Sequence, residues 1–88
     1  MEEIFVGAKD ISKYITACFV GLNKEGNKIK ITSRGNYIKK SIDILAILTR
    51  DYLESWDYNI EVKSEPFENR YVSAVEIELS GIRKKEEK

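Results

Sequence analysis

The sequence contains no histidine, one cysteine and one proline. Without an imidazole, the side chain that most often acts as a general acid or base near neutral pH is missing. Cys18 has no second cysteine to pair with and falls on the apolar face of a predicted helix, so we expect a buried, reduced thiol. The carboxylates follow no spacing typical of a metal or acid–base site. The sequence therefore indicates a protein that is not an enzyme and has no metal, cofactor or small-molecule substrate.

Long apolar runs are also absent. The longest predicted apolar helix is interrupted by Asp43 and Arg50, and the chain starts Met-Glu-Glu, so we expect neither a membrane span nor a signal peptide. The 88 residues are 42% hydrophobic and 34% charged, which is typical of one small ordered domain. We expect a cytoplasmic protein with a single domain at residues 1–82 and a charged tail at residues 83–88. A core of this size is modest, and dimerisation often supplies the missing burial.

The formal net charge is zero, but the charges are segregated along the chain. Residues 1–40 carry 8 Lys/Arg and 4 Asp/Glu (+4), residues 41–79 carry 3 and 9 (−6), and residues 80–88 carry 4 and 2 (+2). A positive surface can therefore coexist with a neutral total.

Apolar periodicity predicts the element order β-α-β-α-β-β. Alternation and helical spacing give strands at residues 3–6, 28–33, 58–62 and 75–79, and helices at residues 10–22 and 36–54. Trp56 is expected to cover the end of the second helix. The segment 64–70 holds the proline and is expected to form a hairpin loop or a protruding arm. Right-handed crossovers would place both helices on one face of a four-stranded mixed sheet, as a two-layer α/β sandwich.

The most informative segment is residues 28–43. Its strand would have one buried face and one cationic face, and the chain then turns at Gly35 into a helix. A helix N-terminus presents unpaired N–H groups and the positive end of the dipole, which favours anions. The donors and the aromatic ring around that terminus suit a sugar-phosphate backbone and are Arg34, Asn36, Tyr37, Lys39 and Lys40. An ordinary turn with solvated lysines is the alternative interpretation.

Three motifs, in this element order, resemble the Alba family of archaeal chromatin and RNA-binding proteins. They are Ile-Phe-Val-Gly-Ala-Lys-Asp-Ile-Ser-Lys-Tyr-Ile at 4–15, Ser-Arg-Gly-Asn-Tyr-Ile-Lys-Lys-Ser-Ile-Asp at 33–43 and Val-Ser-Ala-Val-Glu-Ile at 72–77. The resemblance implies a nucleoid-associated homodimer, or a heterodimer with a paralogue. It further implies binding of duplex DNA or RNA through the backbone, largely without sequence specificity.

A second function stays open from the sequence. The chain is alternatively a weakly binding paralogue that heterodimerises with a more basic Alba-like protein and modulates its nucleic-acid packing. The zero net charge favours this alternative, as does Ala8, which stands where the family usually has its regulated lysine. The choice between DNA and RNA also stays open, because backbone contacts and a stacking aromatic ring serve both.

These patterns and the resemblance together predict the contact residues. The expected nucleic-acid contacts are Lys9, Lys13, Arg34, Gly35, Asn36, Tyr37, Lys39, Lys40, Phe67 and Arg70. In the arm, Phe67 either stacks on a base or folds back onto the sheet, while Glu65 and Glu68 repel phosphate.

The second helix is expected to supply the contacts between subunits. Its apolar spacing puts Ile42 in the core stripe and leaves Ile44 and Ile47 outside it, so these two are the predicted dimer contacts. The resemblance places Tyr52 at the contact between neighbouring dimers.

Overall fold

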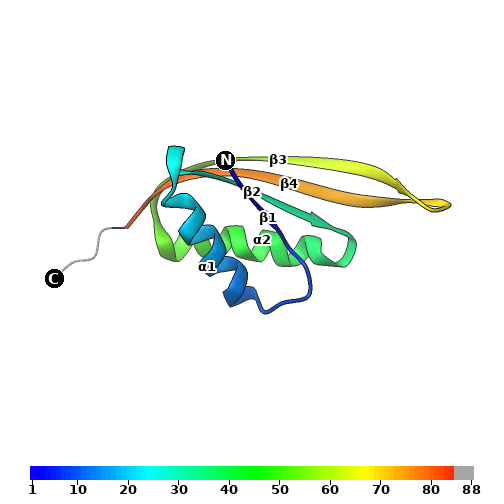
Figure 1. Ribbon diagram of the computed structural model, residues 1–88, viewed down its shortest axis with the longest axis horizontal. Coiled ribbons are helices and arrows are strands. Elements are labelled where there is room, and N and C mark those ends of the chain that lie inside the picture. The colour runs from blue at the N-terminus through cyan, green and yellow to red at the C-terminus, as the bar shows by residue number, and fades with distance from the viewer. Residues whose placement is uncertain (85–88) are drawn as a thin grey trace.

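The computed structural model describes residues 1–84. They form a four-stranded sheet with both helices on one face (Figure 1). This arrangement and its element order confirm the predicted two-layer sandwich. The elements are β1 (Glu2–Phe5), α1 (Ile11–Leu22), η1 (Glu25–Asn27), β2 (Lys28–Arg34), η2 (Gly35–Tyr37), α2 (Ile38–Ile47), η3 (Leu48–Tyr52), β3 (Leu53–Phe67) and β4 (Arg70–Arg83). The predicted tail falls largely outside the described residues, which end at 84, and Arg83 belongs to β4.

The strand order is β1-β2-β4-β3, with β1 parallel to β2 and the other two pairs antiparallel. One row of the register shows how the core forms: Ile4, Ile31, Ile77 and Ile60 are paired across all four strands. Paired side chains share a face of the sheet. The first three isoleucines are buried under the helices, but Ile60 on the edge strand is 39% exposed. The helices therefore cover three strands and leave much of β3 open.

The third and fourth strands are much longer than the sequence predicted. They pair from Leu53 with Arg83 to Phe67 with Arg70, so the segment around Pro66 is a protruding two-stranded arm (Figure 1). Beyond the helices neither face of this hairpin is covered, and apolar alternation is lost although the strand pairing continues. Proline is tolerated because β3 is an edge strand. Trp56 lies within β3, which begins at Leu53, and it is 47% exposed.

The buried face of α2 also differs from the prediction. Ile44 is fully buried in the core and Ile47 is half-buried against it, whereas Ile42 is 39% exposed. The prediction failed because of Ser41, a polar residue that is buried at 0% exposure. Its hydroxyl donates to Ile38 O and accepts from Ser33 Oγ at 2.8 Å. Because the buried serine is polar, a search for apolar periodicity did not identify the buried face of α2. Ile44 has no exposed surface for a second subunit, and its assignment as a dimer contact was wrong.

The contact between α1 and β2 gives a prediction on stability. A Cβ at Gly21 would lie 2.8 Å from Ile29 Cγ2 and 3.3 Å from Glu2 Cβ. Ile29 is fully buried and β-branched, so it has little freedom to move. We expect Gly21→Ala to lower the free energy of unfolding by about 1–3 kcal/mol through overpacking. The gain of about 1 kcal/mol in helix propensity offsets part of that loss, which leaves a net loss of about 2 kcal/mol or less.

Urea denaturation monitored by circular dichroism measures this change. The matched control is Ala17→Gly at an exposed position of the same helix, which should lose about 1 kcal/mol through propensity alone. A Gly21→Ala variant more stable than the natural chain would contradict the close approach of α1 to β2.

Candidate nucleic-acid interface

Three segments that are distant in sequence meet at one end of the molecule (Figure 1). They are the loop between β1 and α1, the turn from β2 into α2, and the β3–β4 arm. Lys40 near the start of α2 bonds to the first loop, and Arg34 at the end of β2 bonds to the arm, so side-chain contacts tie all three together. The structure therefore brings the predicted Lys9, Arg34 and Lys40 into one region.

Lys40 holds the loop between β1 and α1 in place. Its ammonium donates to Gly7 O at 2.8 Å and to Lys9 O at 2.9 Å, and it lies 5.7 Å from the Tyr14 ring centroid and 5.6 Å from that of Tyr37. The Tyr14 hydroxyl completes the arrangement by accepting the N–H groups of Gly7 at 2.8 Å and Lys9 at 3.1 Å. An ammonium has three donor hydrogens, so one remains for a phosphate. Lys40 thus positions the loop that carries Lys9.

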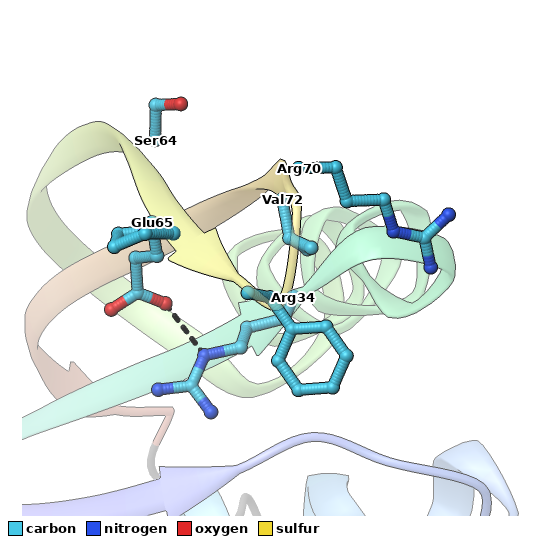
Figure 2. Close-up of a pocket in the computed structure, with 7 residues that line it drawn as sticks. Arg34, Ser64, Glu65, Arg70 and Val72 are labelled. Carbon is cyan, nitrogen blue, oxygen red and sulfur yellow. Dashed lines mark hydrogen bonds and ion pairs between the residues drawn. The ribbon is translucent and has the colours of Figure 1, made fainter.

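Arg34 lies at the end of β2 beside the arm. Its Nε–H donates to Glu65 Oε1 at 2.6 Å, and Figure 2 shows this pair with Arg70 directed away from it. Both side chains are exposed, at 64% and 39%, and such surface pairs contribute only about 0–1 kcal/mol. Gly35 follows with φ +53°, a left-handed backbone that turns the chain sharply into η2 and that glycine adopts without steric cost. The ion pair orients Arg34 without withdrawing it from solvent.

Two hollows adjoin Arg34. The larger, of about 570 Å³, lies against the arm, where Phe67, Arg70 and Val72 line it. The smaller, of about 260 Å³, is lined by side chains from β1, β2 and η2, including Phe5 and Tyr37.

The remaining predicted contacts surround this region. Asn36 is exposed in η2, and Lys9 and Lys13 are exposed in the loop and in the first turn of α1. The Lys39 side chain is 85% exposed and pairs with Asp43 at 2.8 Å, one turn along α2. Phe67 is 55% exposed at the end of β3 and lines the larger hollow, so its contact with nucleic acid stays a prediction.

Two exposed aromatic residues and two sets of contacts in this region were missed from the sequence. Alternation in β1 puts Phe5 opposite the buried Ile4, so its 66% exposure was predictable. Tyr71, exposed at 74%, follows in the same way from its place in the arm. No local pattern indicates the hydroxyl contacts of Tyr14 or the pairing of Glu65 with Arg34, because both join segments distant in sequence.

At the opposite end of α2, an aromatic pair surrounds the predicted dimer–dimer residue. The Tyr52 and Phe19 ring centroids lie 5.6 Å apart in an edge-to-face arrangement, and the Arg83 guanidinium lies 5.1 Å from the Phe19 centroid. Beside them, hydrogen bonds from Arg50 lower the pKa of Asp51. Tyr52 is 38% exposed, which leaves it free to meet a neighbour.

The chemistry of the described residues gives no support to a catalytic site. Burial raises the pKa of the Cys18 thiol to about 12, so it is a neutral hydrophobic group at physiological pH. Within residues 1–84, no cluster of three or more His, Cys, Asp or Glu side chains is placed to hold a metal ion. Neither helix in this range is long and apolar enough to cross a membrane.

Fold and site together define a small two-layer α/β protein with a cationic end and a protruding arm. The sequence model of the Alba family matches residues 2–65. This match covers well over half of the chain, and the chain belongs to the Alba family, as its motifs indicated.

Relatives in archaea agree with this assignment. A DNA/RNA-binding protein Alba from Thermoplasma acidophilum is 33% identical over 82 residues, covering 88% of this chain and 92% of the relative. DNA/RNA-binding protein Alba 1 from Archaeoglobus fulgidus is 28% identical over 82 residues with the same coverage. These relatives are named as nucleic-acid-binding proteins, and neither name denotes an enzyme.

Solved structures show the same fold. Alba from Thermoplasma volcanium superposes with a TM-score of 0.73 at 30% identity, over 90% of this chain and 99% of that one. ALBA1 from Trypanosoma brucei superposes with a TM-score of 0.78 at 12% identity, over 91% of this chain and 68% of that one, which shows a common fold only.

The unequal surroundings of two adjacent lysines give a second prediction. Lys40→Ala removes the bonds to Gly7 O and Lys9 O, so we expect the free energy of unfolding to fall by about 1–2 kcal/mol. Hydrogen exchange at the Gly7 and Lys9 amides should also become faster. Lys39→Ala removes the same charge but only an exposed pair with Asp43, and it should cost about 0.5 kcal/mol or less. Equal losses from the two variants would show that Lys40 does not position the loop.

Proposed function

We propose that this protein binds duplex DNA or RNA through the sugar-phosphate backbone, largely without sequence specificity, as a dimer. The observation that carries the proposal is the convergence of Arg34, the Gly35 turn, the loop with Lys9 and the β3–β4 arm at one end of the molecule. The names of the archaeal relatives, DNA/RNA-binding proteins, agree with it. A place at the nucleoid in the cytoplasm is part of the same proposal.

The chemistry of the predicted contacts supports backbone binding. The exposed groups are ammonium and guanidinium ions and a tight turn, and groups of this kind bind phosphate oxygens whatever the base sequence. Glu76, at the centre of the sheet, is paired locally with two lysines. Glu76 lies 3.0 Å from Lys63 and 3.5 Å from Lys30, and the hydrogen bond from Lys63 lowers its pKa. A neutral total charge therefore does not prevent a cationic end from attracting phosphates.

An uncovered apolar strip supports the dimer. Tyr58 and Ile60 are paired with the buried Leu79 and Ile77, so they lie on the helix-bearing face of the sheet, yet they are 49% and 39% exposed. Ile42 points away from Lys40 and from α1, toward the β3 side of α2. The strip consists of Ile42, Trp56, Tyr58, Ile60 and Val62. A contiguous apolar surface of this kind marks an interaction site, and a second copy or a paralogue would cover it.

One observation favours the second candidate function. Arg34 is already paired with Glu65, and the chain has no net charge, so its affinity for phosphate is lower than that of a basic relative. A heterodimer with a more basic Alba-like protein would then use this chain to modulate packing. The two functions are distinguished by measuring the affinity of the homodimer for duplex nucleic acid, and then the affinity of the same chain when such a partner is present.

The turn after β2 gives the third prediction. We expect Arg34→Ala to weaken binding to duplex nucleic acid by about 1–3 kcal/mol, because a charge-assisted phosphate contact is lost. The slope of log affinity against log salt concentration should decrease in magnitude by about 1, which corresponds to the loss of one phosphate contact. Arg50→Ala is the matched control, since Arg50 is also exposed and paired with an acid, Asp51, but lies at the other end of α2.

Fluorescence anisotropy across a salt series measures both variants. Arg50→Ala should stay within about 0.5 kcal/mol of the natural chain, since its site lies away from the cationic end. Equal losses from the two arginines would show that overall charge, rather than the turn, determines binding.

The fourth prediction concerns the uncovered apolar strip. Ile42→Glu places a charge in the proposed interface while keeping a good helix former, so we expect a monomer of 10.2 kDa by sedimentation at micromolar concentration. Val20→Glu is the control at an exposed apolar position of α1, 49% accessible, and should stay dimeric. If both variants remain dimeric, the interface lies elsewhere on the molecule.

A further inference from the structure

Arg34 separates two hollows that each contain an aromatic side chain. On the arm side, the hollow of about 570 Å³ is lined by Phe67 and Arg70. On the β1 side, the hollow of about 260 Å³ is lined by Phe5 and Tyr37. Arg34 lines both, so the two hollows are neighbours at the end of β2.

The strand register places these rings on one face. Phe5 pairs with Thr32, two residues before Arg34, so the three side chains lie on the same side of the sheet. The register continues from Arg34 across β4 to β3 and puts Phe67 on this side as well. Ser33, between Thr32 and Arg34, points the other way and bonds to α2 through its hydroxyl. Phe5, Arg34 and Phe67 therefore belong to the face opposite the helices.

The aromatic side chains that line the two hollows are exposed. Phe5 is 66% exposed, Phe67 is 55% exposed and Tyr37 is 39% exposed. None of them lies in the hydrophobic core, so the fold does not need them there. Aromatic rings exposed beside cationic groups are the usual platform for unpaired nucleobases.

Arg34 retains the donors that suit a phosphate. Glu65 occupies its Nε–H, and no hydrogen bond or ion pair within residues 1–84 uses its two terminal nitrogens. Those nitrogens form a planar set of N–H donors that matches phosphate oxygens. Glu65 fixes the guanidinium between the hollows, which reduces the conformational entropy lost on binding.

We infer that this face binds two consecutive unpaired nucleotides. One base lies in the smaller hollow against Phe5 and Tyr37, the other lies in the larger hollow against Phe67, and Arg34 binds the phosphate that links them. Bases within an intact duplex are stacked on each other and cannot offer a ring face to these side chains, so the site selects bulges, loops and single strands. The inference rests on the proposed nucleic-acid binding and adds a ligand that the backbone contacts alone do not select.

The test compares three RNA probes of the same strand sequence. They are a fully paired duplex of about 20 base pairs, the same duplex with a two-adenosine bulge, and the single strand, with DNA versions as further arms. Fluorescence anisotropy should show that the natural chain prefers the bulged duplex over the paired one by about tenfold. Phe5→Ala and Phe67→Ala should each reduce that preference by about fivefold or more, and Phe5→Ala, which lies outside the predicted duplex contacts, should leave paired-duplex affinity within about twofold.

Tyr71→Ala is the matched control. Tyr71 is 74% exposed and belongs to the same arm, but it pairs with Pro66, so it lies on the opposite face from Phe67. All three aromatic side chains are exposed, and circular dichroism should show an unchanged fold in each variant. We expect Tyr71→Ala to keep the preference for the bulge.

The outcomes separate this inference from the proposed function. Equal affinity of the natural chain for paired and bulged duplexes overturns the inference and leaves duplex binding intact. A loss of preference in Tyr71→Ala equal to that in Phe67→Ala also overturns it, because the arm as a whole would then be responsible. Absence of binding to any probe overturns both proposals. A preference confined to RNA supports the inference and identifies RNA as the source of the unpaired nucleotides, whereas a preference shared with DNA supports a site that accepts both.

Discussion

The two helices are too short to cover the sheet, and the other surface features follow from this constraint. α1 has 12 residues and α2 has 10, which correspond to about 15–18 Å, whereas the 15 residues of β3 extend about 50 Å. The helices bury β1, β2 and the adjoining part of β4, and β3 lies at the edge beyond them. Near the helices, the uncovered part of β3 exposes an apolar strip that suits another subunit. Farther along it leaves the helices altogether and forms the arm.

Apolar periodicity was sufficient to predict the fold, but its predictions failed in two places where hydrogen bonds, rather than apolar packing, order the chain. The row of isoleucines through Ile31 and Ile77 alternates cleanly, and the element order followed from such patterns. Ser41 breaks the stripe of α2 because its hydroxyl is satisfied inside the core, and this moved the predicted buried face from Ile44 to Ile42. The arm lacks alternation because neither face is covered. In both places the chain is ordered by hydrogen bonds, which leave no apolar signature in the sequence.

The candidate site was predictable in composition but not in the roles of its members. The Arg-Gly turn and the neighbouring lysines were evident because cations gather within a few residues of a helix start. Whether a given cation is free or engaged depends on contacts across the fold. Lys40 bonds to a loop more than thirty residues earlier in the chain, and Arg34 bonds to an arm 31 residues later. Lys39, next to Lys40 in the sequence, instead points into solvent.

The weakness of the Arg34–Glu65 pair is what makes it compatible with binding. A buried pair would have to be broken at a cost of several kcal/mol, whereas this exposed pair is screened by water and salt. Glu65 binds one edge of the guanidinium, and the remaining N–H donors can bind a phosphate without displacing Glu65. The base of the arm is held beside the end of β2 by strand pairing, in which Arg34 is opposite Ala74 of β4. The surface pair with Glu65 therefore sets only the direction of the arginine, on a position that the sheet already fixes.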